Sequence, residues 1–140
     1  MEILTSVICD SAAEYAGKLC IMGAFDTIYA HHFPVVHPHF AVALRIIFRP
    51  VEEGTHKVRV TFIDSDGHNV LPREGEPNFE FKIMPIPEST SFVTRNFVIS
   101  IQGLPLQKPS QYSFDVYMDE QIIARIPLQV VVAPSQGKQG

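Results

Sequence analysis

Four of the six histidines lie within nine residues of one another, and their side chains are the best metal ligands in the sequence. They are His31, His32, His37 and His39, grouped around two prolines. Neutral imidazole binds zinc, copper and nickel, provided that three or four donors converge on the ion. Asp26 precedes them and could add a carboxylate. These five residues are the candidate ligands for a divalent transition metal.

One residue separates His37 from His39, so in an extended chain both side chains project from the same face and could chelate. We expect that face to be the outer one if strand 40–48 continues backwards. The alternative is that all four histidines are polar loop residues that bind nothing. The number of donors does not show that they converge. The sequence therefore favours a protein without a metal or cofactor and keeps the metal site as the alternative.

The segment Asp64-Ser65-Asp66-Gly67-His68-Asn69 resembles the start of a calcium loop but lacks its spacing. An EF-hand loop needs glycine at its sixth position and glutamate at its twelfth, whereas counting from Asp64 gives Asn69 and Gly75. An Asp-Gly hairpin turn accounts for the segment, and we predict such a turn there.

The cysteines and carboxylates form no recognisable catalytic arrangement. Cys9 and Cys20 lack Cys-x-x-Cys spacing, and we expect two buried free thiols. The sequence has no nucleophile elbow, Walker loop, dinucleotide fingerprint or His-Glu-x-x-His motif. Nothing singles out an acid–base pair among the carboxylates. These absences favour a protein that is not an enzyme.

Basic side chains are expected to gather on one outer sheet face. Arg45, Arg49, Lys57 and Arg59 all fall on the outward side of two predicted strands. The chain has 11 basic and 15 acidic side chains, a net charge of −4 and no run of Lys or Arg, so we expect neither nucleic-acid nor membrane binding. A solvated face is the simplest interpretation, and a surface that binds an anion or a protein is the alternative.

Composition predicts a single β-rich domain. The 140 residues suit one domain, and 46% of them are apolar, which is enough for a core. Val and Ile, 14 of each, outnumber 7 Leu and 9 Ala, and 11 Pro and 8 Gly supply turns. No apolar run is long enough to span a membrane, and no signal peptide is expected after Met1. We therefore expect a cytoplasmic protein.

Alternation of apolar and polar residues places the strands. In residues 40–48 the even-numbered positions are expected to face inward, and a hairpin loop at 52–55 leads to a second strand over 57–64. Further inward stripes are predicted over 79–83 and 97–101. A final hairpin over 112–132 is expected to turn at Asp119-Glu120, and residues 133–140 are expected to form a flexible tail.

The first forty residues alternate less regularly. We expect strands over 3–9 and 18–22, joined through 11–17, with one helical turn over 12–16 as a further option. A symmetric hairpin would pair Ile8 with Ile21 and Cys9 with Cys20. Downstream, Ala41 and Ala43 are predicted to form an exposed strip that could seat a second subunit.

About eight short strands without a long helix predict an all-β fold. We expect an antiparallel β-sandwich of immunoglobulin-like or C2-like topology, with residues 1–132 as a single domain. A partly open barrel is the alternative. The entry to the strand at 109–112 is similar to a corner in which a tyrosine hydroxyl, here that of Tyr112, bonds back to the loop.

Several short motifs occur together along nearly the whole chain. They resemble those of a family of uncharacterised, mostly bacterial β-rich proteins. The resemblance implies a small stand-alone β-sandwich in the cytoplasm, with no assigned activity and no catalytic residue to transfer. The motifs are Cys9-Asp10, Gly17-Lys18-Leu19, Gly23-x-Phe25-Asp26-x-Ile28, Phe33-Pro34, Asp64-x-Asp66-Gly67 and Tyr112-x-Phe114-x-Val116.

Two functions from different classes fit these observations. The first is a non-catalytic binding or interaction module that takes a protein partner, a second copy of itself or a small ligand through its loops or a sheet edge. A purely structural subunit is a variant of it. The second is a small metalloprotein, for example a hydrolase, built on the four histidines and Asp26. The missing catalytic motifs favour the first.

Overall fold

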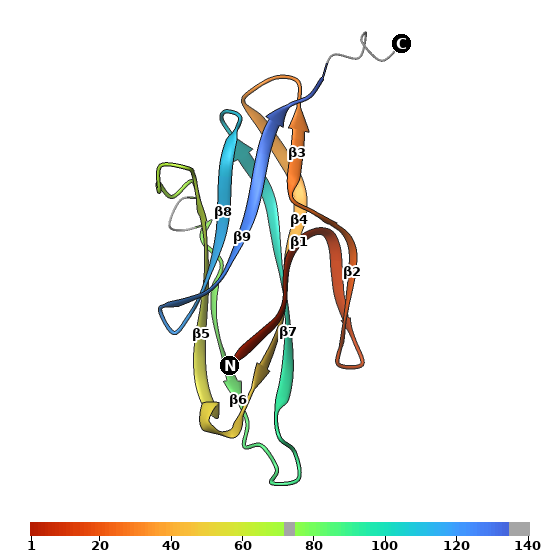
Figure 1. The fold of residues 1–140 in the computed structure, drawn as a ribbon, viewed down its shortest axis with the longest axis vertical. Helices are drawn as coiled ribbons and strands as arrows, with labels where there is room; N and C mark the ends of the chain where they lie inside the picture. Colours follow the sequence, from red (N-terminus) through yellow and green to blue (C-terminus); the bar gives the residue numbers. More distant parts are fainter. Residues whose placement is uncertain (72–74, 135–140) are drawn as a thin grey trace.

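The computed structural model describes residues 1–71 and 75–134, and within them the chain forms two β-sheets packed face to face (Figure 1). One 3₁₀ turn, η1 (Pro50–Glu52), lies between β4 (Val35–Phe48) and β5 (Gly54–Ile63). The strands are β1 (Glu2–Tyr15), β2 (Lys18–Phe25), β3 (Thr27–Ala30), β4 (Val35–Phe48), β5 (Gly54–Ile63), β6 (Asn78–Ile83), β7 (Val93–Leu106), β8 (Ser110–Met118) and β9 (Gln121–Val132).

The strand order makes the sandwich immunoglobulin-like. One sheet has the order β2-β1-β4-β7, and the other has the order β3-β9-β8-β5-β6. If β1, β4 and β7 are taken as strands A, B and E, then β5, β6, β8 and β9 correspond to C, C′, F and G. Paired strands are antiparallel, except that β3 runs parallel to β9. The predicted sandwich is confirmed, with nine strands in the described residues and one parallel pair.

The expected tyrosine corner is also present at the start of β8. The Tyr112 hydroxyl donates a hydrogen bond of 2.9 Å to the carbonyl oxygen of Lys108. At the same end of the final hairpin, β9 ends at Val132. The predicted tail over 133–140 lies, from residue 135 onward, outside the described residues and stays a prediction.

Aromatic side chains from both sheets fill the core. The even-numbered positions of β4 from Phe40 to Phe48 are all fully buried, as the alternation predicts. Phe40 meets Phe114 of the opposite sheet edge to face, with ring centroids 5.5 Å apart. Phe114 in turn stacks on Phe62 of β5 at 4.4 Å. These contacts fix β4, β5 and β8 relative to one another across the sandwich.

The predicted hairpin between residues 40–48 and 57–64 is wrong, because β4 and β5 belong to different sheets. Pro50 ends β4, and the chain then crosses between the sheets at η1, where the Arg49 amide donates to the Glu52 carboxylate at 2.9 Å. Arg45 and Arg59 consequently lie on opposite outer faces of the sandwich. The expected single basic face is therefore two separate faces.

The N-terminal hairpin, β1 and β2, curls back over the outer face of its own sheet (Figure 1). β1 pairs with β4 as far as Cys9, and its remaining residues pair with β2 through a tight turn at Ala16-Gly17. At the tip, the Gly17 carbonyl accepts hydrogen bonds from the side chains of Arg45 and Asn96, at 3.0 and 3.1 Å. The hairpin is thus tied to both β4 and β7.

This hairpin overturns three expectations about the N-terminal region. Cys9 pairs with Ala24 and not with Cys20, and the helical turn is absent because β1 continues to Tyr15. Ala41 and Ala43, predicted to be exposed, are 2% and 0% exposed.

The hairpin places the two cysteine thiols in different environments, although both were expected to be buried. Cys9 is buried with the two alanines, and Leu19 and Ile21 of the hairpin pack against this cluster, whereas Cys20 is exposed. Small side chains allow the hairpin to approach the sheet closely.

Gly23 allows the hairpin to bend. Its φ is +69°, and a Cβ at this position would lie 2.5 Å from a carboxylate oxygen of Asp10. Gly103 of β7 has a similar φ of +67°, but no described atom lies within 4 Å of its would-be Cβ. Both glycines therefore have a left-handed backbone conformation, but only at Gly23 would an added side chain contact another residue.

We expect Gly23→Ala to destabilise the protein more than Gly103→Ala. Both alanines would carry about 1–2 kcal/mol of left-handed backbone strain, and only the first must also displace Asp10. Urea unfolding measures the difference. In a Cys20→Ser background, labelling of the remaining thiol, Cys9, should also be faster with Gly23→Ala, because the hairpin opens more often. Equal effects of the two substitutions would contradict this role of Gly23.

Candidate functional site

The clustered histidines occupy different environments. His31 and His32 lie in the loop between β3 and β4, both exposed, with ring centroids 6.4 Å apart. His37, on β4, is half-buried and packs against the ring of Phe40 at 5.5 Å, whereas His39 is exposed. Burial lowers the pKa of His37. The two members of the predicted chelating pair are therefore not equivalent.

Asp26 does not join these histidines in a compact group within the described residues. Its carboxylate accepts a hydrogen bond of 2.8 Å from the Thr27 hydroxyl. In residues 1–71 and 75–134, three candidate ligand atoms lie within 4.8 Å of one another only at Asp64, Asp66 and His68. There Asp64 accepts the backbone N–H groups of Asp66 and His68, both at 2.9 Å, and these bonds lower its pKa. This group is the predicted Asp-Gly turn.

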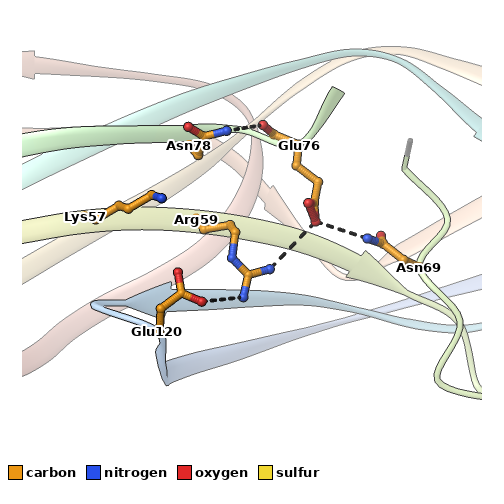
Figure 2. A pocket seen from close by; sticks show the side chains of 6 residues that line it. All are labelled: Lys57, Arg59, Asn69, Glu76, Asn78 and Glu120. Atoms are coloured by element: carbon orange, nitrogen blue, oxygen red, sulfur yellow. Dashed lines mark hydrogen bonds and ion pairs between the residues drawn. The ribbon is translucent and has the colours of Figure 1, made fainter. Parts of the chain in front are cut away.

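A polar pocket of about 560 Å³ lies on the outer face of the five-stranded sheet (Figure 2). Strand β5 contributes two cationic side chains, while the β5–β6 connection, β6 and the β8–β9 turn contribute amides and carboxylates. We call this the Arg59 pocket, and its lining residues are Lys57, Arg59, Asn69, Glu76, Asn78 and Glu120.

Arg59 is held at the centre of this pocket by three neighbours. Its guanidinium carbon lies 4.1 Å from the ring centroid of Tyr117, which is its cross-strand partner on β8. One terminal nitrogen is 3.2 Å from Glu120, whose side chain is 63% exposed, and the other is 3.8 Å from Glu76. The ring orients the guanidinium, and the two carboxylates balance its charge.

Glu76 forms the inner wall of the pocket. Its side chain is 7% exposed, and its carboxylate accepts a hydrogen bond of 3.1 Å from the Asn69 amide. The Asn78 amide donates to the Glu76 carbonyl at 3.3 Å (Figure 2). The wall is therefore a buried, fixed carboxylate, whereas Glu120 at the rim is exposed.

His56 lies one residue before the pocket on β5 and faces inward. Its side chain is 12% exposed and lies between the rings of Phe48 and Phe81, each with a centroid 5.6 Å away. Its two ring nitrogens lie 2.6 Å from the Asp119 carboxylate and 2.6 Å from the Glu52 carbonyl oxygen. A carbonyl and a carboxylate can only accept, so the imidazolium, with hydrogen on both nitrogens, is the form of His56 that satisfies both contacts.

The pKa values of this group follow from the same contacts. Burial lowers the pKa of His56, but the Glu52 carbonyl and the Asp119 carboxylate raise it, and the net value lies above the usual one. Burial raises the pKa of Asp119, yet the bonds from His56 and from the Lys57 amide bring it below its usual value. His56 and Asp119 thus form an ion pair that joins β5 to the β8–β9 turn, with the imidazole 12% exposed and the carboxylate 48% exposed.

Asp119 anchors the turn that carries Glu120. Its second carboxylate oxygen accepts the Lys57 N–H at 2.9 Å, and its own N–H donates to the Lys57 carbonyl at 2.9 Å. Asp119 and Glu120 both have positive φ, 52° and 67°, as a tight two-residue hairpin turn requires. The anchored turn sets Glu120 beside Arg59.

Sequence reasoning found part of this site. It predicted that Lys57 and Arg59 face outward and that the chain turns at Asp119-Glu120, and both predictions are confirmed. It missed the contributions of His56 and Glu76. The alternation of side chains along β5 could have revealed the position of His56, because it puts His56 on the opposite side of the strand from Lys57 and Arg59.

Nearly the whole chain matches one protein-family model. A model described as "Family of unknown function (DUF6941)" matches residues 4–131. The chain belongs to this family. The expected relationship to an uncharacterised family is confirmed, while the particular motifs and the bacterial distribution stay predictions. No curated protein matches this DUF6941 member.

Among solved structures, the DUF6941 chain is similar to a glycosyl hydrolase family 2 member from Bacteroides cellulosilyticus. The identity is 10%, the TM-score is 0.36, and the match covers 69% of this chain and 13% of that chain. The chain therefore spans a small part of the length of that protein. Among the described residues of the DUF6941 member, no helix has the length and hydropathy needed to cross a bilayer.

We expect native mass spectrometry of the untagged protein, purified without chelator, to give the mass of the metal-free chain. The reason is that the histidines and Asp26 do not bring three ligand atoms together in the described residues. A stoichiometric added mass of zinc, nickel or copper that disappears in His37→Ala/His39→Ala would contradict this expectation. It would also establish the metalloprotein alternative.

The His56 contacts predict a stability that falls as the pH rises. A group whose pKa is raised by folding stabilises fully below its unfolded value, about 6.5, and loses that contribution as the pH passes its folded value. Asp119, with a lowered pKa, contributes above about pH 4 and loses its contribution in acid. The pair therefore stabilises most between about pH 5 and 6.5.

Urea unfolding from pH 5 to 9 measures this effect. The difference in unfolding free energy between the native sequence and His56→Gln should shrink as the pH rises above about 6.5. His39→Gln, at an exposed position, is the matched control and should show no such trend. A His56→Gln difference that stays constant from pH 5 to 9 would show that folding does not raise the pKa of His56 and would contradict this role of the imidazole.

Proposed function

We propose that the protein is a non-catalytic interaction module that takes a carboxylate group of a protein partner in the Arg59 pocket. The observation that carries this proposal is the state of Arg59. Its guanidinium is oriented by Tyr117 at 4.1 Å, yet its closest ion pair is with Glu120, which is 63% exposed. Exposed ion pairs contribute about 0–1 kcal/mol, so another carboxylate can replace this one.

The chemistry of the lining favours a carboxylate. A guanidinium presents a planar fork of donors that matches the two oxygens of a carboxylate, and Lys57 adds a second cation beside it. The amides of Asn69 and Asn78 can donate to or accept from the neighbouring backbone of a partner. An acidic side chain on a protein surface provides both features.

The pocket offers binding without an evident reaction. Its six lining residues include no serine, threonine or cysteine and no histidine that could form a nucleophile–base pair. The metalloprotein alternative has no observation in its favour beyond the histidine count, and native mass spectrometry decides it. The expected cytoplasmic location is part of this proposal and is supported by the two free cysteines, since disulfides are rare there.

A titration followed by ¹⁵N NMR tests the proposal. A capped tetraglutamate peptide should shift the amide signals of Lys57, Arg59 and Glu120, and a capped tetraglutamine peptide should not. Arg59→Gln should weaken binding at least about tenfold, because a charge-assisted bond is lost. Glutarate, a small dicarboxylate, is titrated in the same way. Binding of glutarate without binding of the peptide would indicate that the pocket takes a small ligand and not a protein partner.

Arg125→Gln is the matched control for Arg59→Gln. Arg125 is exposed on β9 of the same sheet and does not line the pocket. Both variants remove one positive charge, so the long-range repulsion between the protein and the acidic peptide changes equally. Equal weakening in the two variants, or equal binding of tetraglutamate and tetraglutamine, would sink the proposal.

A further inference from the structure

We infer that Glu120 is a built-in competitor of the ligand carboxylate, and that the His56–Asp119 contact controls how strongly it competes. The inference rests on the proposed function and adds a means of regulation to the same pocket. Its basis is that two consecutive residues of one turn reach the two sides of β5. Asp119 bonds to His56 on the inner side, and Glu120 pairs with Arg59 on the outer side.

Glu120 occupies the place that a ligand carboxylate would take. Its oxygen lies 3.2 Å from a terminal nitrogen of Arg59, at the open rim of the pocket (Figure 2). Glu76 lies on the inner side and is buried, so a ligand entering from solvent meets the Glu120 position first. Binding therefore exchanges one carboxylate for another on the same guanidinium.

The strength of the competition depends on how firmly the turn is held. Asp119 is fixed by His56 and by two hydrogen bonds to the Lys57 backbone, one accepted by its carboxylate and one donated by its own N–H. A held turn keeps Glu120 near Arg59 at little cost in entropy, so its effective concentration at the guanidinium is high. A loosened turn lowers that concentration and leaves Arg59 more available to a ligand.

Protonation of His56 is the variable that can loosen the turn. A neutral imidazole has one hydrogen, so either the Asp119 carboxylate or the Glu52 carbonyl would face a lone pair at 2.6 Å. In either tautomer the ring has also lost its positive charge, so its contact with the Asp119 carboxylate weakens and the turn is held less firmly. We therefore expect affinity for a carboxylate ligand to increase as His56 loses its proton.

The charged groups close to His56 also influence how the affinity depends on pH. Asp119 faces it from the β8–β9 turn, and Glu52 from η1, where it pairs with the Met1 ammonium. Strands β4 and β6 present the rings of Phe48 and Phe81. An α-amino group also ionises near neutral pH, so the test must separate Met1 from His56. His56→Gln makes that separation, since it keeps Met1 unchanged.

The first test compares Glu120→Gln with Glu14→Gln in the tetraglutamate titration at pH 6. Glu120→Gln should bind about two- to fivefold more tightly than the native sequence, the equivalent of a surface ion pair. Glu14 is exposed on the N-terminal hairpin, over the other sheet, and its substitution changes the net charge equally. Equal effects of the two substitutions, with binding still dependent on Arg59, would overturn the inference and leave the proposed function intact.

The second test follows the peptide affinity from pH 6 to 8.5. The native sequence should bind more tightly as the pH rises, whereas Glu120→Gln and His56→Gln should show no such increase. Asp119→Asn provides a second route if His56→Gln does not fold. A pH dependence that persists in His56→Gln would contradict the role of His56. Absence of any Arg59-dependent binding would overturn the proposed function itself.

Discussion

Alternation along β5 is the constraint on which the site depends. Val58, Val60 and Phe62 are fully buried, and Phe62 is part of the aromatic contact that joins the sheets. Because successive side chains of a strand point to opposite faces, this burial leaves Arg59 no position except the outer face. His56, of the opposite parity, is placed at the inner edge between two rings. A slip of one residue would exchange the two roles.

The pairing of β8 with β5 completes the arrangement. It sets Tyr117 opposite Arg59, and it ends β8 where the turn residues can reach both sides of β5. Asp119 goes to the buried imidazole and Glu120 to the exposed guanidinium. One tight turn thus links a contact with a largely buried imidazole, 12% exposed, to a contact with a guanidinium whose side chain is 28% exposed.

Local patterns predicted the strands, but several predictions about how those strands pair and pack were wrong. The inward stripe of β4 and the hairpin of β8 and β9 could be read from periodicity, because each involves neighbouring residues. The short loop after Pro50 fits a hairpin as well as a crossing between sheets, so it does not reveal which one forms. The burial of Ala41 and Ala43 depends on an earlier hairpin that bends at Gly23, eighteen residues before Ala41. No local pattern contains that information.

The candidate site was harder to predict than the fold for the same reason. The histidines attract attention because they are close in sequence, whereas the Arg59 pocket gathers residues from β5, β6, their connection and the distant β8–β9 turn. Arg59 and Glu120 are 61 positions apart, so their contact could not be predicted before the strand order was known.

The pocket's charges also limit what it can bind. Glu76 is buried beside Arg59 and cannot move away as Glu120 can, so a second carboxylate entering the pocket would meet an uncompensated negative charge. The overall charge of −4 adds a weak, salt-dependent repulsion toward acidic partners. Selectivity for a single, well-placed carboxylate then follows from the geometry. Because that carboxylate replaces Glu120 on the same guanidinium, the net gain from the ion pair is reduced by the contact that it displaces, and the neighbouring amides add to the affinity.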